Sequence, residues 1–177
     1  MADRTLAIGA PAPAFALKTA GGETVRLSDV RGKKVVLYFY PKDDTPGCTR
    51  EACSFQQNLS RVTKSGAVVL GVSCDNVTSH QRFAEKFKLT FPLLSDPDAA
   101  VSKAYGVYKQ KSMYGRTFWG IERTTFIIDG QGRIARIFPR VSVDGHTEAV
   151  LEAIRQTPAT TRPGTKTFGA GARAFTG

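Results

Sequence analysis

The sequence is poor in the residues that build disulfide frameworks, metal centres or membrane spans. It has three cysteines and two histidines among 177 residues. An odd, low number of cysteines disfavours a structural disulfide framework. The Cys-x4-Cys spacing of Cys48 and Cys53, with no histidine nearby, is also a poor match to a zinc site. Because no apolar run approaches the roughly 20 residues that a transmembrane helix needs, we expect no membrane partner.

The start of the chain lacks a recognisable targeting segment. The apolar residues 6–8 are interrupted by Gly9 and Pro11, so they are too few for the core of a signal peptide. Asp3 and a single Arg4 do not match a transit peptide, which is rich in Arg and Ser and poor in acids. We therefore expect a cytoplasmic location.

Composition indicates one globular domain followed by a tail. Apolar content of 41% and charged content of 23% are ordinary, and the length suits one domain with a substantial core. We expect that domain over 1–157 and a flexible basic tail, rich in Gly, Ala, Thr and Pro, over 158–177. The net charge of +10 makes nucleic acid worth considering. Because the basic residues are spread along the chain, we favour a solvated basic surface and no nucleic-acid partner.

The segment 35–55 carries the strongest signal for chemistry. Residues 35–40 form an apolar, β-branched and aromatic run typical of a buried strand. A short polar turn follows, and then Thr45 suits the N-cap of a helix with a proline at its first position. Cys48 falls in the first turn, where unpaired N–H groups and the positive end of the helix dipole favour an anion such as a thiolate. Cys53 follows five residues later on the same helix.

Helical periodicity separates the two cysteines. At about 100° per residue, Cys48 belongs to the apolar stripe, whereas Cys53 lies toward the polar side. Lys64 and Gly66 suit the end of this helix. The stripe consists of Cys48, Ala52, Phe55, Leu59 and Val62.

The remaining patterns alternate strands with helices, which predicts an α/β sheet with an N-terminal β-hairpin at one edge. We expect 106–122 to be irregular and a final helix over 146–156. Two further helices are expected after Asn76 and from Asp96. The expected strands outside 35–40 are 14–17, 23–27, 67–72, 91–94, 124–129 and 133–138.

Several of these residues form a motif. The block Pro41-x3-Thr45-x2-Cys48 resembles the peroxiredoxin active-site motif. Its extension GCTREAC, which ends at Cys53, is similar to the atypical two-cysteine branch called bacterioferritin comigratory protein or peroxiredoxin Q. The likeness covers roughly 6–156, with further matching blocks at 79–80, 91–96, 105–107 and 123–129.

The resemblance implies a thioredoxin-like fold with a central mixed sheet, and two-electron reduction of hydrogen peroxide or organic hydroperoxides. Cys48 is then the peroxidatic thiolate and Cys53 the resolving thiol, which form an intramolecular disulfide reduced by a thioredoxin-type donor. Thr45 and Arg123 bind the peroxide oxygens and the sulfur, and Pro41 shields the pocket. No metal or organic cofactor is required, and we expect a monomer or weak dimer.

Some residues have a plainer interpretation beside the functional one. Cys53 also fits an unreactive cysteine beside a helix core, and Cys74 is expected to be partly buried and not catalytic. Glu51 either joins an arginine network or merely favours the helix start, and both remain open. Trp119 is expected to pack in the core rather than line the pocket.

The acids and histidines near the site have plainer roles still. Asp43 and Asp44 are expected to be turn residues rather than acid–base catalysts. His80 and His146 lie near expected helix starts, and neither is placed to act as a base for Cys48.

Three other functions fit the sequence less well. A thiol–disulfide oxidoreductase normally uses Cys-x2-Cys, and the two cysteines here are further apart. A copper metallochaperone using Cys48 and Cys53 lacks a well-placed histidine or methionine. Nucleic-acid binding or holdase activity rests on net charge alone.

Overall fold

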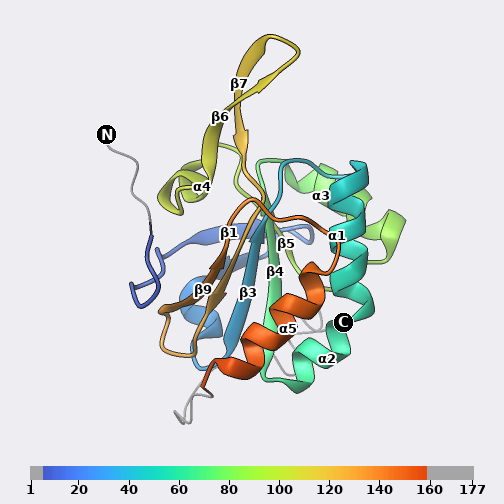
Figure 1. The fold of residues 1–177 in the computed structure, drawn as a ribbon. Coiled ribbons are helices and arrows are strands. Elements are labelled where there is room, and N and C mark those ends of the chain that lie inside the picture. Colours follow the sequence, from blue (N-terminus) through green and yellow to red (C-terminus); the bar gives the residue numbers. More distant parts are fainter. Residues whose placement is uncertain (1–5, 159–177) are drawn as a thin grey trace.

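The computed structural model describes residues 6–158 and contains a seven-stranded mixed sheet (Figure 1). The strand order is β2-β1-β5-β4-β3-β8-β9. The central strands β3, β4 and β5 are parallel, and the pairs β3–β8, β8–β9, β1–β5 and β1–β2 are antiparallel. This confirms the expected central mixed sheet. The strands are β1 Ala16–Thr19, β2 Thr24–Arg26, β3 Lys34–Phe39, β4 Ala67–Ser73, β5 Leu93–Ser95, β8 Thr124–Ile128 and β9 Ile134–Phe138.

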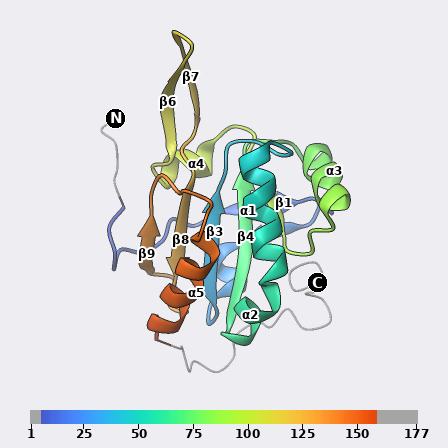
Figure 2. The same ribbon diagram turned by 45° about the vertical axis from the view of Figure 1, so that its right-hand side comes forward.

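The sheet divides the core into two layers, and helices pack against it (Figure 2). Because successive side chains of a strand point to opposite faces, β3 contributes to both layers. Val36 and Tyr38 face α1, α2, α3 and α5, whereas Val35 and Leu37 face η1 and the segment after α4. The helical segments are η1 Leu27–Val30, α1 Pro46–Gln57, α2 Leu59–Lys64, α3 Val77–Phe87, α4 Ala100–Ala104 and α5 His146–Gln156.

Most expected elements are present with small shifts of their ends. The N-terminal hairpin β1–β2 lies at one edge of the sheet, as expected. The expected hairpin β8–β9 is also present and lies at the other edge. The strand expected at 91–94 is β5, and the helix expected from Asp96 begins at Ala100. The last helix has the expected bounds. The expected tail lies outside the described residues except for residue 158.

The helix that follows Thr45 is interrupted, which the sequence did not predict. Asn58 separates α1 from α2 with φ −107° and ψ 10°. Its side-chain amide donates to the carbonyl oxygen of Ser54 at 2.9 Å. Asparagine competes with regular helical hydrogen bonding in this way, and the unbroken apolar stripe hid the interruption.

The prediction that 106–122 is irregular is wrong. The segment forms a β-hairpin, β6 Tyr108–Met113 and β7 Arg116–Ile121, that projects from the body of the molecule (Figure 1). Tyr114 and Gly115 have φ of 53° and 77°, as a two-residue type I′ turn requires. Most of its residues are half-buried or exposed, so the sequence shows no apolar–polar alternation.

Trp119 does not pack in the core, which corrects a second expectation. Its side chain is 59% exposed on β7. It stacks on Tyr108 of β6, with ring centroids 5.8 Å apart. The hairpin projects away from the core, so it offers no packing surface large enough to bury an indole. The two rings cover each other instead.

The described helices include none that is both long and apolar enough to cross a bilayer. The carboxyl ends of the central strands β3 and β4 lie at the same end of the sheet as the start of α1 (Figure 2). In open α/β sheets, ligand-binding and active sites form just outside the carboxyl ends of the strands. Cys48 lies there.

Candidate active site

The loop between β3 and α1 places Cys48 at the carboxyl end of the central strands. Thr45 is the N-cap residue of α1, as predicted, and its carbonyl accepts a bond from the Thr49 N–H at 2.8 Å. The Thr45 hydroxyl does not cap the helix but donates to the carbonyl of Lys42 at 2.9 Å. Pro41 lies half-buried at the start of this loop. The expected cap position is therefore correct, although the backbone of the loop holds the threonine.

Cys48 is buried and in contact with a cation. Its side chain lies in the core layer between the sheet and helices α1, α2, α3 and α5, and it is 1% exposed. The Arg123 guanidinium donates from Nη2 to Cys48 Sγ at 3.2 Å. Arg123 immediately precedes β8, whose first residue, Thr124, pairs with Phe39 at the end of β3. The sheet register thus brings together two residues 75 positions apart, as the resemblance implied.

Glu51 shares the same guanidinium. Arg123 Nη1 donates to Glu51 Oε1 at 2.6 Å, and the carboxyl is buried. Burial raises the pKa of Glu51 to about 7, and Arg123 offsets only part of that rise. Burial lowers the pKa of Arg123, but Glu51 and Cys48 outweigh it and the net shift is upward. Of the two interpretations left open for Glu51, the structure supports the arginine network.

Gly47 is required by the approach of the arginine. A Cβ atom at this position would lie 3.1 Å from Arg123 Nη2, closer than an ordinary van der Waals contact. An alanine here would require the guanidinium to shift by a few tenths of an ångström. The glycine weakens the first helical turn by roughly 1 kcal/mol relative to alanine, and the close contact gives a reason for that cost.

Cys53 lies on α1 without a comparable environment. All three cysteines are free thiols, and Cys53 is half-buried. Burial raises the pKa of its thiol. Five residues along a regular helix separate the Cα atoms of Cys48 and Cys53 by about 8.6 Å. A disulfide needs Cα atoms within roughly 7 Å, so this helical form holds the two thiols too far apart to bond.

Cys74 is placed away from this pair. It packs, half-buried, against the core layer on the opposite face of the sheet from Cys48. Burial, and after it the charge of Asp96, raises the pKa of the Cys74 thiol. The expectation of partial burial is confirmed, and its lack of a catalytic role stays a prediction.

Two residues near the sulfur were missed by sequence reasoning. Tyr38 is buried with its ring against Gly71 on β4, where a Cβ would lie 2.9 Å from it. Burial, followed by the charges of Glu51 and Cys48, raises the pKa of Tyr38 well above its usual value. Lys111 on β6 is half-buried, and burial followed by Arg123 lowers its pKa. Tyr38 was assigned only to a strand, and Lys111 fell in the segment expected to be irregular.

Neither histidine contacts the Cys48 sulfur among the described residues. His146 Nε2 bonds the Thr125 hydroxyl at 2.9 Å, and burial followed by Arg123 lowers the pKa of His146 to about 4. His80 pairs instead with Asp43 at 2.7 Å. Asp43 is not simply the turn residue that was expected, because its carboxylate is buried and both of its oxygens accept hydrogen bonds.

The family model described as AhpC/TSA family matches residues 8–137. The chain belongs to this family. A putative peroxiredoxin bcp of Coxiella burnetii is 52% identical over 147 residues, which cover 83% of this chain and 97% of the relative. Peroxiredoxin Bcp of Bacillus subtilis is 44% identical, covering 85% and 96%.

Comparison with solved structures leads to the same family. A cysteine mutant of Xylella fastidiosa PrxQ matches with a TM-score of 0.82 at 41% identity, covering 86% of this chain and 98% of that one. Peroxiredoxin Q of Xanthomonas campestris matches with a TM-score of 0.77 at 44% identity, covering 80% and 90%. The resemblance to the Bcp or peroxiredoxin Q branch and the thioredoxin-like fold are both confirmed. The chain is a thiol-dependent peroxidase of the peroxiredoxin type, with peroxidatic and resolving cysteines.

Proposed function

We propose that Cys48 is the peroxidatic residue and reduces hydrogen peroxide and organic hydroperoxides. Its thiolate attacks one peroxide oxygen, the O–O bond breaks, and the other oxygen leaves as water or an alcohol after taking up a proton. The sulfur becomes a sulfenic acid and so loses the two electrons that the peroxide gains. The observation that carries this assignment is the Arg123 guanidinium 3.2 Å from the buried Cys48 sulfur.

Arg123, Thr45 and Pro41 are proposed to serve that attack. The thiolate is the reactive form, and both a cation and a helix N-terminus favour it. Negative charge develops on the leaving oxygen, and fixed donors aimed at it lower the barrier. Arg123 and the backbone N–H of Cys48 supply such donors, and so does the Thr45 hydroxyl once it turns from the Lys42 carbonyl. Pro41, at the start of the loop, shields the pocket from water.

We further propose that Cys53 resolves the sulfenic acid. Its thiolate attacks the Cys48 sulfur, a disulfide forms, and the sulfenic oxygen leaves as water. A thioredoxin-type dithiol then reduces the disulfide by exchange. Because the cysteines are about 8.6 Å apart on a regular helix, the first turns of α1 must unwind for this step.

The setting of the reaction follows from its chemistry. The Xanthomonas campestris bacterioferritin comigratory protein is described by its alkyl peroxide reduction activity, which supports organic hydroperoxides as substrates here. A dithiol donor requires a reducing compartment, so we propose the cytoplasm. No metal or organic cofactor enters any step, and a monomer or weak dimer contains all the residues named.

A coupled assay tests the proposal. Consumption of hydrogen peroxide and of an alkyl hydroperoxide is followed with thioredoxin, thioredoxin reductase and NADPH. Cys48→Ser is expected to abolish turnover with the fold retained, whereas Cys74→Ser, the matched control, keeps it. Turnover retained in Cys48→Ser contradicts the assignment. Disulfide reduction without peroxide dependence would favour the rival thiol–disulfide oxidoreductase.

A further inference from the structure

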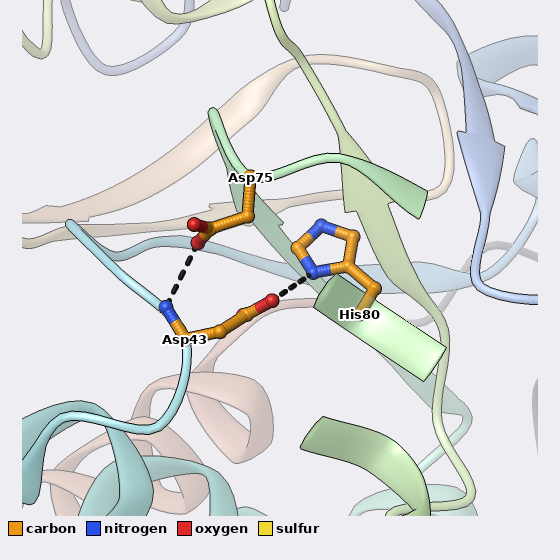
Figure 3. A group of neighbouring side chains, drawn as sticks. All are labelled: Asp43, Asp75 and His80. Atoms are coloured by element: carbon orange, nitrogen blue, oxygen red, sulfur yellow. Dashed lines mark hydrogen bonds and ion pairs between the residues drawn. The ribbon is translucent and has the colours of Figure 1, made fainter. Parts of the chain in front are cut away.

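A buried carboxylate lies in the loop five residues before Cys48. Asp43 Oδ1 accepts a hydrogen bond from the Tyr40 hydroxyl at 2.6 Å. Its Oδ2 accepts one from the Ser79 hydroxyl at 2.8 Å. The same oxygen pairs with His80 Nδ1 at 2.7 Å (Figure 3). This single side chain therefore joins the end of β3 to the first turn of α3.

The histidine in this group has a fixed orientation. His80 Nε2 lies 3.0 Å from the carbonyl oxygen of Leu94 on β5, and because a carbonyl has no proton, Nε2 must donate. One further proton then lies between Nδ1 and the Asp43 carboxyl. The pair is neutral overall, whichever atom holds that proton. His80 is 0% exposed, so removing one partner leaves a buried polar group unpaired.

A second carboxylate fixes the backbone of the same loop. The Asp43 N–H donates to Asp75 Oδ2 at 2.8 Å (Figure 3). That oxygen also accepts from the Ser73 hydroxyl at the end of β4, at 2.7 Å. The Ser95 hydroxyl of β5 donates to the Asp75 carbonyl at 2.6 Å. We call the following six residues the Asp43 network: Tyr40, Asp43, Ser73, Asp75, Ser79 and His80.

The arrangement does not suit a cation. Asp43, Asp75 and His80 present ligand atoms within 4.8 Å of one another. However, Asp43 Oδ2 and Asp75 Oδ2 are each already bonded by two partners within the protein, and one imidazole nitrogen donates to a carbonyl. A metal would have to displace these bonds. The group is therefore a closed network of hydrogen bonds.

The loop that this network holds has little regular structure of its own. Asp44 has φ 57°, in the left-handed region that residues other than glycine rarely adopt. Thr45 then returns to an extended conformation as the N-cap of α1. Arg123 reaches Cys48 from a different element, so the distance between them depends on where the loop places the first turn of α1. A displacement of 1 Å at such a site costs roughly 10²-fold in rate.

We propose that the Asp43 network positions the peroxidatic loop, so that the Cys48 sulfur meets Arg123 in the geometry for peroxide attack. This inference rests on the proposed function of Cys48. Asp43 and His80 touch neither the sulfur nor the Arg123 guanidinium among the described contacts, so they are positioning residues. The expected consequence is a loss of selectivity for peroxide over other electrophiles, because both need the Cys48 thiolate but only peroxide also needs donors aligned with its leaving oxygen.

The test compares two reactions of Cys48 in four proteins: wild type, Asp43→Asn, Ser79→Ala and Lys86→Met. The last is the control, because the exposed Lys86–Asp44 ion pair at 2.9 Å joins the same loop to the same helix. Rates with hydrogen peroxide and with iodoacetamide are measured by mass spectrometry of the Cys48 peptide. Asp43→Asn is expected to lower the peroxide rate about 10- to 100-fold and Ser79→Ala about threefold to tenfold. Iodoacetamide rates should change less than about threefold, and the control should stay within about twofold for both reagents.

The outcomes separate the two proposals. An equal fall of both rates in Asp43→Asn, or no fall of either, overturns the positioning role. Where Asp43→Asn does not fold, Ser79→Ala decides, and an unchanged ratio of peroxide to iodoacetamide rates in that variant overturns it. A wild-type Cys48 that does not react with peroxide overturns the proposed function itself.

Discussion

The two turns of α1 that carry cysteines differ in almost every respect. Cys48 is 1% exposed and lies 3.2 Å from a guanidinium. Cys53, five residues later, is half-buried, and burial raises the pKa of its thiol. Contacts from distant parts of the chain hold the first sulfur. The second sulfur is placed by its own helix. In the proposed mechanism, Cys48 therefore attacks peroxide from a geometry that is already formed, whereas the reaction of Cys53 requires α1 to unwind first.

Removing the cation should have the largest effect on this contrast. Arg123→Met keeps the length and bulk of the side chain but removes the donors, so the rate of Cys48 with peroxide should fall about 10²- to 10³-fold. Stopped-flow measurement of that rate checks the prediction. Arg50→Met is the matched control, because Arg50 lies on α1 in an exposed pair with Asp144. A fall of less than about threefold in Arg123→Met would show that the guanidinium is dispensable.

Removing the second thiol should stop the cycle but not its first step. Cys53→Ser should react once with peroxide at about the wild-type rate and then remain a sulfenic acid, open to over-oxidation. Steady-state turnover with thioredoxin should be lost, and mass spectrometry should show added oxygen on Cys48. Undiminished turnover would mean that another thiol resolves, and mapping the disulfide formed would identify it.

The helix itself should respond to oxidation. Reduced and disulfide forms should differ in hydrogen-exchange protection over 45–57, because Phe55 must leave its buried position when the first turns of α1 unwind. Strands β3 and β4 serve as the internal control and should keep their protection. Identical protection in both states, with the Cys48–Cys53 bond established by mass, refutes the unwinding.

A smaller effect is expected on stability against pH. The pKa of Glu51 is raised to about 7 in the folded protein, above its ordinary value of 4.5. Folding thus favours the neutral form of the Glu51 carboxyl. The contribution of Glu51 to the stability of the fold is complete below about pH 4.5 and is lost as the pH rises through about 7. Glu51→Gln should therefore gain stability relative to the wild type between pH 5 and 8, on the order of 1–3 kcal/mol. Melting temperatures across that range measure it.

Two outcomes bear on that prediction. Glu152→Gln is the control, because Glu152 is an exposed partner of Arg155 and should change the pH profile little. Parallel profiles for the wild type and Glu51→Gln would show that Glu51 stays ionised throughout. That result would make Arg123 a stronger partner for Glu51 than its burial indicates.

Local sequence signals determined the elements that build the site. The apolar run 35–40, the proline after Thr45 and the periodicity of α5 gave a strand and two helix starts that the structure confirms. These features depend on residues adjacent in the chain, so they can be read without knowledge of packing. The same signals placed Cys48 in the first turn of a helix, on its buried side.

Tertiary structure decided what surrounds that cysteine. The sheet register of β3 and β8 brought Arg123 to the sulfur, and the choice between two roles for Glu51 depended on that arrival. The burial of Asp43 with His80 had no local signal, because an aspartate in a turn and one in a buried network look alike in sequence. Likewise, the exposed face of Trp119 followed from a hairpin with little beneath it. Local preference acts over a few residues, whereas charge pairing and burial depend on which distant segments become neighbours.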